Sequence, residues 1–143
     1  MKTNNQPTQW AIADGVNLFV LNNATSLEGA INIYVKRILR DEYDIKPDAE
    51  GKLLTKANLQ AAYEDWADTM IENMENDGYE PGKYVIDMDG MIDNWSNRYW
   101  VAELYLGATT WEAINNQFQY ELIRDIFIRK GIEEKEYEIK ATA

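Results

Sequence analysis

The fold is decided by residues 63–93, which read YEDWADTMIENMENDGYEPGKYVIDMDGMID. Apolar side chains recur at steps of three or four residues from just before this stretch through its first half: Leu59, Tyr63, Trp66, Met70 and Met74. Because that spacing places them on one face of a helix, we predict a helix over Lys56–Asp77. Thr55 is the expected N-cap, and Gly78 is the expected left-handed terminator.

The second half of the stretch changes character at Pro81-Gly82, which predicts a turn. We expect a short extended segment over 83–86 after this turn. Asp87 then precedes an apolar-periodic run, so it is expected to cap a short helix over Met88–Asn97.

On the N-terminal side, the apolar runs Trp10–Ala13 and Val16–Leu21 are joined by Asp14-Gly15, a strong hairpin signal. A long amphipathic helix follows. Thr25 and Glu28 have the spacing of a capping box, which predicts that this helix begins at Thr25.

On the C-terminal side, residues 99–106 alternate in the way typical of a strand. Thr109 and Glu112 repeat the capping-box spacing, so we predict a last helix from Thr109 to Lys130, with Gly131 as its stop. The apolar stripe expected on this helix consists of Trp111, Ile114, Phe118, Leu122 and Ile126. Residues 133–141 are expected to form a charged edge strand.

Two units of strand, cap and helix share the pattern Ala-Thr-Ser/Thr-apolar-Glu at residues 24–28 and 108–112. One interpretation is an internal duplication. The other is that both helices use the same common cap, and this is preferred because only the cap and its neighbours match.

These elements predict an α+β protein. We expect a small, mostly antiparallel sheet made of the N-terminal hairpin, the strand at about 99–106 and the C-terminal strand, packed with three longer helices and one short helix. A chain of 143 residues fits a single domain, placed at 9–141 after a flexible N-terminus at 1–8. Tryptophans 66, 95, 100 and 111 fall on apolar faces and are expected to pack in the core.

The formal charge of −11 and the pI near 4.4 argue against nucleic acid or an anionic membrane surface as a direct ligand. No apolar run approaches the roughly 20 residues that a spanning helix needs, and the polar start does not resemble a signal peptide. The absence of cysteine fits a reducing compartment, so we expect the cytoplasm of a host cell.

The sequence predicts a non-catalytic protein without a metal or another cofactor. Histidine, the commonest general base and metal ligand, is absent. Asp87, Asp89 and Asp93 invite a calcium-loop interpretation, but the twelfth position of such a loop would be Arg98 instead of an acid. A hydrolase that uses carboxylates, with or without a divalent metal, remains the weakest alternative.

The strongest functional feature is a set of acidic residues on the predicted helix and beyond it. They are Asp65, Asp68, Glu72, Glu75, Glu80, Asp87, Asp89 and Asp93. The first four follow steps of three and four, so neighbours in this row lie about 5–6 Å apart, a spacing comparable to that of phosphates along nucleic acid. The last four are expected to continue the row round a bend. The alternative is an acidic surface that serves only solubility.

Residues 84–93, YVIDMDGMID, resemble the C-terminal portion of ArdA-type antirestriction proteins of plasmids and phages. Tyr84, Ile86, Asp87 and Asp93 carry this resemblance, together with the acidic helix upstream. The chain departs from the family pattern at Asn94-Trp95, and at Ile92 where the family has arginine. The resemblance implies an acidic DNA mimic that occupies the DNA groove of a restriction enzyme, and anti-CRISPR proteins share this acidic character.

We therefore expect a phage or plasmid inhibitor that blocks a nucleic-acid-dependent host defence enzyme. Its eight acidic residues would contact the basic, nucleic-acid-binding surface of that enzyme. The alternative is an immunity protein or phage assembly protein whose acidic face docks a basic partner. The sequence leaves homodimerisation open.

Overall fold

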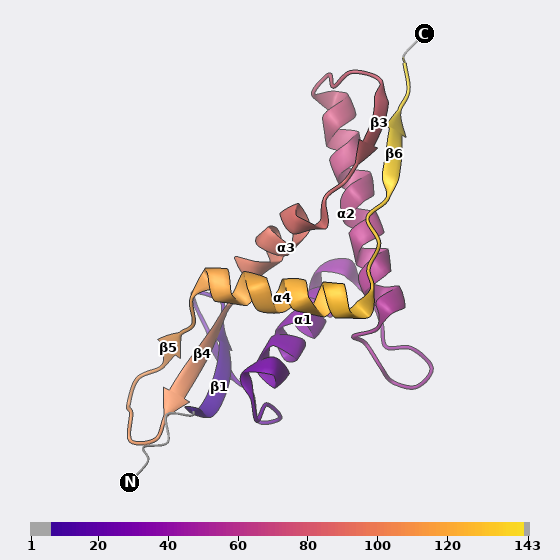
Figure 1. Ribbon diagram of the computed structural model, residues 1–143. Coiled ribbons are helices and arrows are strands. Elements are labelled where there is room, and N and C mark those ends of the chain that lie inside the picture. The colour runs from indigo at the N-terminus through magenta and orange to yellow at the C-terminus, as the bar shows by residue number, and fades with distance from the viewer. Residues whose placement is uncertain (1–6, 142–143) are drawn as a thin grey trace.

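The computed structural model describes residues 7–141 and confirms the α+β class (Figure 1). In this part of the chain, four helices pack with a four-stranded and a two-stranded sheet. The larger sheet lies at one end of the molecule, and the smaller sheet lies beside α2 at the other end (Figure 1).

The larger sheet is antiparallel, in the order β2-β1-β4-β5. Its strands are β1 Pro7–Ala13, β2 Leu18–Val20, β4 Trp100–Tyr105 and β5 Glu112–Ala113. The predicted hairpin joins β1 to β2, and the Asp14 carboxylate accepts hydrogen bonds from the backbone N–H groups of Val16 and Asn17 at 2.9 and 2.7 Å. β1 begins two residues inside the segment predicted to be flexible, and residues 1–6 lie outside the described part of the chain.

The four helices are α1 Leu27–Tyr43, α2 Lys56–Asn76, α3 Met88–Ser96 and α4 Asn116–Lys130. The predicted caps Thr55 and Asp87 are confirmed, because each side chain accepts a hydrogen bond from a first-turn N–H. The predicted terminators are confirmed too. Gly78 and Gly131 have φ of +82° and +72°, a left-handed conformation that suits glycine.

The smaller sheet pairs β3 Gly82–Val85 with β6 Glu136–Ile139 in antiparallel register. The C-terminal strand therefore pairs with the segment after the Pro81-Gly82 turn, whereas the sequence analysis placed it beside the N-terminal hairpin. Alternation alone identifies a strand but not its partner, because pairing depends on where the intervening helices carry the chain.

Two predicted helix starts are wrong. The side chain that caps α1 is Ser26, which accepts from the N–H of Gly29 at 3.0 Å, one residue after Thr25. The last helix is capped by Asn115, six residues after Thr109. It starts late because Glu112 forms part of strand β5, where it pairs with Glu103 of β4 instead of entering the helix. With neither predicted cap in place, the structure offers no support for an internal duplication.

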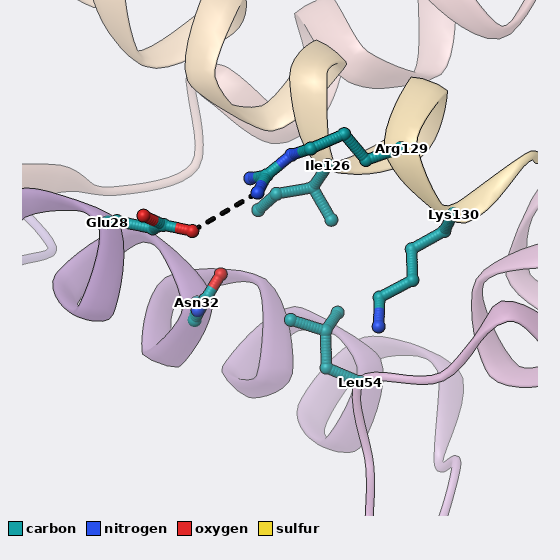
Figure 2. A pocket seen from close by; sticks show the side chains of 6 residues that line it. All are labelled: Glu28, Asn32, Leu54, Ile126, Arg129 and Lys130. Atoms are coloured by element: carbon teal, nitrogen blue, oxygen red, sulfur yellow. Dashed lines mark hydrogen bonds and ion pairs between the residues drawn. The ribbon is translucent and has the colours of Figure 1, made fainter.

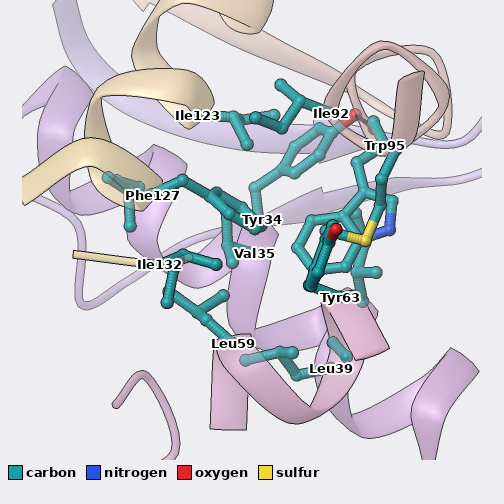
Figure 3. Packing of buried hydrophobic residues seen from close by; sticks show 14 of the residues in the cluster. Tyr34, Val35, Leu39, Leu59, Tyr63, Ile92, Trp95, Ile123, Phe127 and Ile132 are labelled. Atoms are coloured by element: carbon teal, nitrogen blue, oxygen red, sulfur yellow. Dashed lines mark hydrogen bonds between the residues drawn. The ribbon is translucent and has the colours of Figure 1, made fainter. Parts of the chain in front are cut away.

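The core lies where α1, α2, α3 and α4 pack against one another (Figure 3). It continues into the larger sheet through α1, which packs on β1 and β4. Its largest fully buried side chains include Trp95, Tyr34, Tyr63 and Phe127, and the rings of Trp95 and Phe127 meet edge to face at 5.3 Å. Of the four tryptophans expected in the core, Trp95 is fully buried. The other three are half-buried, whereas Trp10 is 5% exposed.

A buried glutamine connects α4 to the junction of α3 and β4. The side chain of Gln119 accepts from the N–H of Val101 at 2.5 Å and donates to the carbonyls of Ser96 and Tyr99. The start of α4 is displaced from the prediction, so the expected apolar stripe is wrong in part, and Phe118 is exposed while Gln119 faces inward. A buried amide is stable here because its oxygen and nitrogen are both satisfied.

Candidate partner-binding surface

The acidic row of α2 lies on the solvent side of that helix. Asp65, Asp68, Glu72 and Glu75 are all exposed. Successive residues of an α-helix are rotated by about 100° around the helix axis, so these four side chains lie within a sector of about 80° around that axis. The opposite side of α2 carries Leu59, Ala62, Tyr63, Ala67 and Ile71, which are buried. Burial of this apolar face stabilises α2 and fixes the direction in which the row points.

Negative charge is concentrated in one part of the molecule, which we call the acidic region and define as residues 56–96 and 132–140. It holds α2, β3, α3 and β6, and it carries fourteen acidic and four basic side chains, a formal charge of −10. The rest of the chain carries eleven acidic and ten basic side chains, so it contributes only −1 to the total of −11. The charge is therefore strongly polarised between the acidic region and the near-neutral remainder of the chain.

Most of the predicted site residues carry uncompensated charge. Within the described residues, seven of the eight form no ion pair, and the exception is Asp89, which pairs with Arg124 of α4 at 3.2 Å. The row on α2 therefore has no internal cations that a partner would need to displace.

The eight acids do not form one continuous row. Glu75 and Glu80 line the same surface hollow at the end of α2, together with Lys140. Asp87 is the N-cap of α3, and Asp89 and Asp93 lie within that helix. The start of α3 is separated from α2 by an apolar groove, which Asp87 lines. The middle of the α2 row points about 180° away from Met70, which lines that groove. The structure thus divides the predicted site into an α2 group with Glu80 and an α3 group.

The apolar groove was missed by the sequence analysis. Its walls are Trp66, Met70 and Met74 of α2, Tyr84–Ile86 at β3, and Asp87 and Gly90 at the start of α3. Its volume is about 430 Å³. The spacing of Trp66, Met70 and Met74 predicted a buried stripe, but these side chains are half-buried because β3 does not cover them completely. Periodicity identifies an apolar face and not the area of it that a neighbouring element covers.

The negative potential of α2 extends to the neighbouring strand. Burial raises the pKa of the Tyr137 hydroxyl in β6 to about 12, and the carboxylates of Asp68 and Glu64 contribute to the same shift. A negative charge on Tyr137 would be repelled by these carboxylates, so the neutral phenol is favoured.

A separate hollow of about 250 Å³ lies between α1 and α4 (Figure 2). Glu28 and Arg129 form an ion pair of 3.2 Å across it, and Lys130 lies beside Leu54 at its other side. Because its one carboxylate, Glu28, already pairs with Arg129 and its remaining charge is the cation Lys130, this hollow lacks the uncompensated negative charge of the acidic region.

Two observations on the described residues concern the carboxylate-hydrolase alternative. These residues bring no three potential ligands together as a metal site. Burial raises the pKa of the Glu42 carboxyl, but Arg98 opposes that shift through an ion pair of 3.2 Å, and Glu42 lies outside the acidic region.

Comparisons with protein-family models, curated proteins and solved structures found no match. None of the described helices is both long and apolar enough to span a bilayer.

Proposed function

We propose that this protein is a non-catalytic, acidic inhibitor of phage or plasmid type that mimics the charge of DNA. It blocks a nucleic-acid-dependent host defence enzyme, of the restriction or CRISPR kind, by occupying the basic surface with which that enzyme grips phosphates. The observation that carries this proposal is the concentration of −10 of the formal charge of −11 in the acidic region.

Two further features support the proposal. Neighbours in the α2 row are separated by about 5–6 Å, a spacing comparable to that of phosphates along a nucleic-acid backbone. Their side chains form no ion pairs with described residues, so each is available to an arginine or lysine of the partner.

The test is a pull-down from a bacterial lysate with three baits: the wild-type protein, the double variant Asp68→Lys/Glu72→Lys, and a matched control. The control is Glu112→Lys/Glu121→Lys, which makes the same change in net charge at two exposed acids of the near-neutral part. We expect the wild type and the control to recover the same DNA-handling enzyme, and the α2 variant to lose it. High salt and added duplex DNA should both displace the enzyme.

Recovery of the same enzyme by all three baits would contradict the α2 row as the interface. The alternative function is an immunity or phage assembly protein whose acidic face docks a basic partner. The apolar groove favours this alternative, because an apolar surface is useful toward a protein and adds nothing to mimicry of phosphates. Recovery of a salt-resistant partner that duplex DNA does not displace would support the immunity or assembly function.

A further inference from the structure

Strand β3 has one unpaired edge. The N–H of Ile86 donates to the carbonyl of Lys135 at 3.3 Å, which shows which backbone groups point toward β6. Because hydrogen-bonded and non-hydrogen-bonded positions alternate in an antiparallel pair, Lys83 and Val85 direct their N–H and C=O groups to the opposite edge. No other strand of the described residues pairs along that edge.

The apolar groove follows this unpaired edge. Tyr84 and Val85 point to opposite faces of β3, yet both line the groove, so the groove borders the edge of the strand and not one of its faces. Val85 is 63% exposed. The far wall of the groove is formed by Trp66, Met70 and Met74.

The segment that leads into β6 is attached to α2 by several side-chain contacts. The N–H of Lys135 donates to the hydroxyl of Tyr63 at 2.8 Å, its ammonium group pairs with Glu64 at 3.0 Å, and Gln60 exchanges two hydrogen bonds with the backbone of Glu133. These contacts hold the start of β6 against α2, and β3, which pairs with β6 on one side, keeps its other edge free beside the apolar wall.

The charges near the groove specify what it can accept. Asp87 lines one end, and Asp77 and Glu80 follow Met74 at the end of α2. The surrounding acidic region has a formal charge of −10, so a segment with Lys or Arg near its ends is attracted and an acidic one is repelled. The apolar wall contains two methionines, whose flexible side chains adapt to different apolar partners.

We propose that an extended, basic segment of a partner protein adds to the free edge of β3. Its backbone pairs with Lys83 and Val85, its alternate apolar side chains enter the groove against Met70 and Met74, and its flanking cations contact Asp87 and Glu80. Strand addition of this kind obtains affinity from backbone hydrogen bonds and specificity from the groove. This inference rests on the proposed function only in taking the partner to be a basic protein.

The probe is a short, fluorescent synthetic peptide that alternates valine with threonine and carries a lysine pair at each end. Two further peptides have the same sequence but are N-methylated on every second amide. One carries the methyl groups on the odd-numbered residues and the other on the even-numbered residues, so each peptide has one of its two edges blocked. Binding is measured by anisotropy at about 0.15 M salt. We expect one methylated peptide to lose binding and the other to retain it, because only one set of amides faces β3.

The decisive variant is Val85→Pro, which removes an N–H and blocks the free edge without removing a hydrogen bond to β6. The matched control is Glu138→Pro, at the equivalent position on the outer edge of β6. Met70→Gln tests the groove wall by a side-chain change alone. We expect Val85→Pro and Met70→Gln to weaken peptide binding about tenfold or more, and Glu138→Pro to change it about twofold or less. Hydrogen exchange of the Lys83 and Val85 amides should slow when the wild-type protein binds the peptide.

Equal affinity of the peptide for the wild type, Val85→Pro and Met70→Gln would overturn the inference, as would equal binding of both methylated peptides. Loss of binding in Asp68→Lys/Glu72→Lys alone would leave the charged row as the interface and exclude the groove. Loss in Val85→Pro and Met70→Gln alone would support the groove and count against the row.

Discussion

Tyr63 connects three elements of the acidic region through a single hydroxyl. The hydroxyl donates to the carbonyl of Ile86 at 2.6 Å and accepts from the N–H of Lys135 at 2.8 Å. In an undisturbed antiparallel pair, that N–H would donate directly to that carbonyl. Tyr63 is inserted between them, so α2 holds the end of the β3–β6 pair in position.

We predict that Tyr63→Phe lowers the free energy of unfolding by about 1–3 kcal/mol, because it leaves a buried carbonyl and an N–H without their partner. The measurement is urea unfolding, combined with hydrogen exchange, which should accelerate at Lys135. Tyr79→Phe is the control, because Tyr79 is largely exposed. Equal unfolding midpoints for the two variants would show that the bridge contributes nothing.

The tyrosines also predict a loss of stability in alkali. Burial is the main cause of a raised pKa at Tyr34 and Tyr63, and of the shift at Tyr137 from 10.0 to about 12. Their neutral hydroxyls are favoured in the folded state, so their contribution is complete below pH 10 and is lost as the pH rises toward the folded-state values. We expect the urea midpoint to fall between about pH 10 and pH 12, with tyrosinate absorbance rising in the same transition. Tyr137→Phe should reduce this pH dependence, and a midpoint that stays constant would exclude the mechanism.

Helix starts show how neighbouring elements choose among several possible caps. Thr109 and Asn115 both precede apolar residues, but Glu112 and Ala113 are held in β5 by pairing with Glu103 and Ala102. This pairing delays the helix until Asn115, whose side chain accepts from the N–H of Gln117 at 2.7 Å. The competition between a strand pair and a helical turn is therefore settled by the neighbouring strand β4.

This competition yields a paired prediction. Asn115→Ala should cost about 1 kcal/mol of stability, because it removes the hydrogen bond of the N-cap, and Thr109→Ala should change stability by less than about 0.5 kcal/mol. Thermal or urea unfolding of both variants provides the measurement. A larger loss in the Thr109 variant would mean that the helix starts at the position first expected.

The molecule as a whole is polarised, and this has a cost. The acidic region concentrates like charges that repel one another, and Asp68 and Glu72 stand four residues apart on the same face of α2. An equal distribution of these charges over the surface would reduce the repulsion. The concentration is therefore unfavourable for the isolated protein and becomes favourable when a basic partner neutralises it.

We predict that the thermal midpoint rises as sodium chloride increases from about 0.01 to about 0.5 M, because salt screens this repulsion. Calorimetry or circular dichroism measures the midpoint. The rise should be smaller in Asp68→Lys/Glu72→Lys and unchanged in Glu112→Lys/Glu121→Lys. A midpoint that falls with salt would show that attractive ion pairs outweigh the repulsion.

Several features could be derived from local sequence because their causes are local. Thr55, Asp87, Gly78 and Gly131 act on the backbone within a few residues, and each has the predicted role. The exposure of the α2 row could be derived as well, because an amphipathic helix must turn its charged side away from its apolar side. The function expected from this row remains a prediction.

Other features depend on contacts between residues distant in the sequence. The pairing of β6 with β3, the ion pair of Asp89 with Arg124, and the separation of the α3 acids from α2 all require knowing how helices pack. The groove belongs to this group as well, because it exists where β3 leaves Met70 and Met74 incompletely covered. Short-range hydrogen bonding and helical periodicity determine the elements and the faces they present. Long-range packing alone decides which of those faces meet and which remain open to a partner.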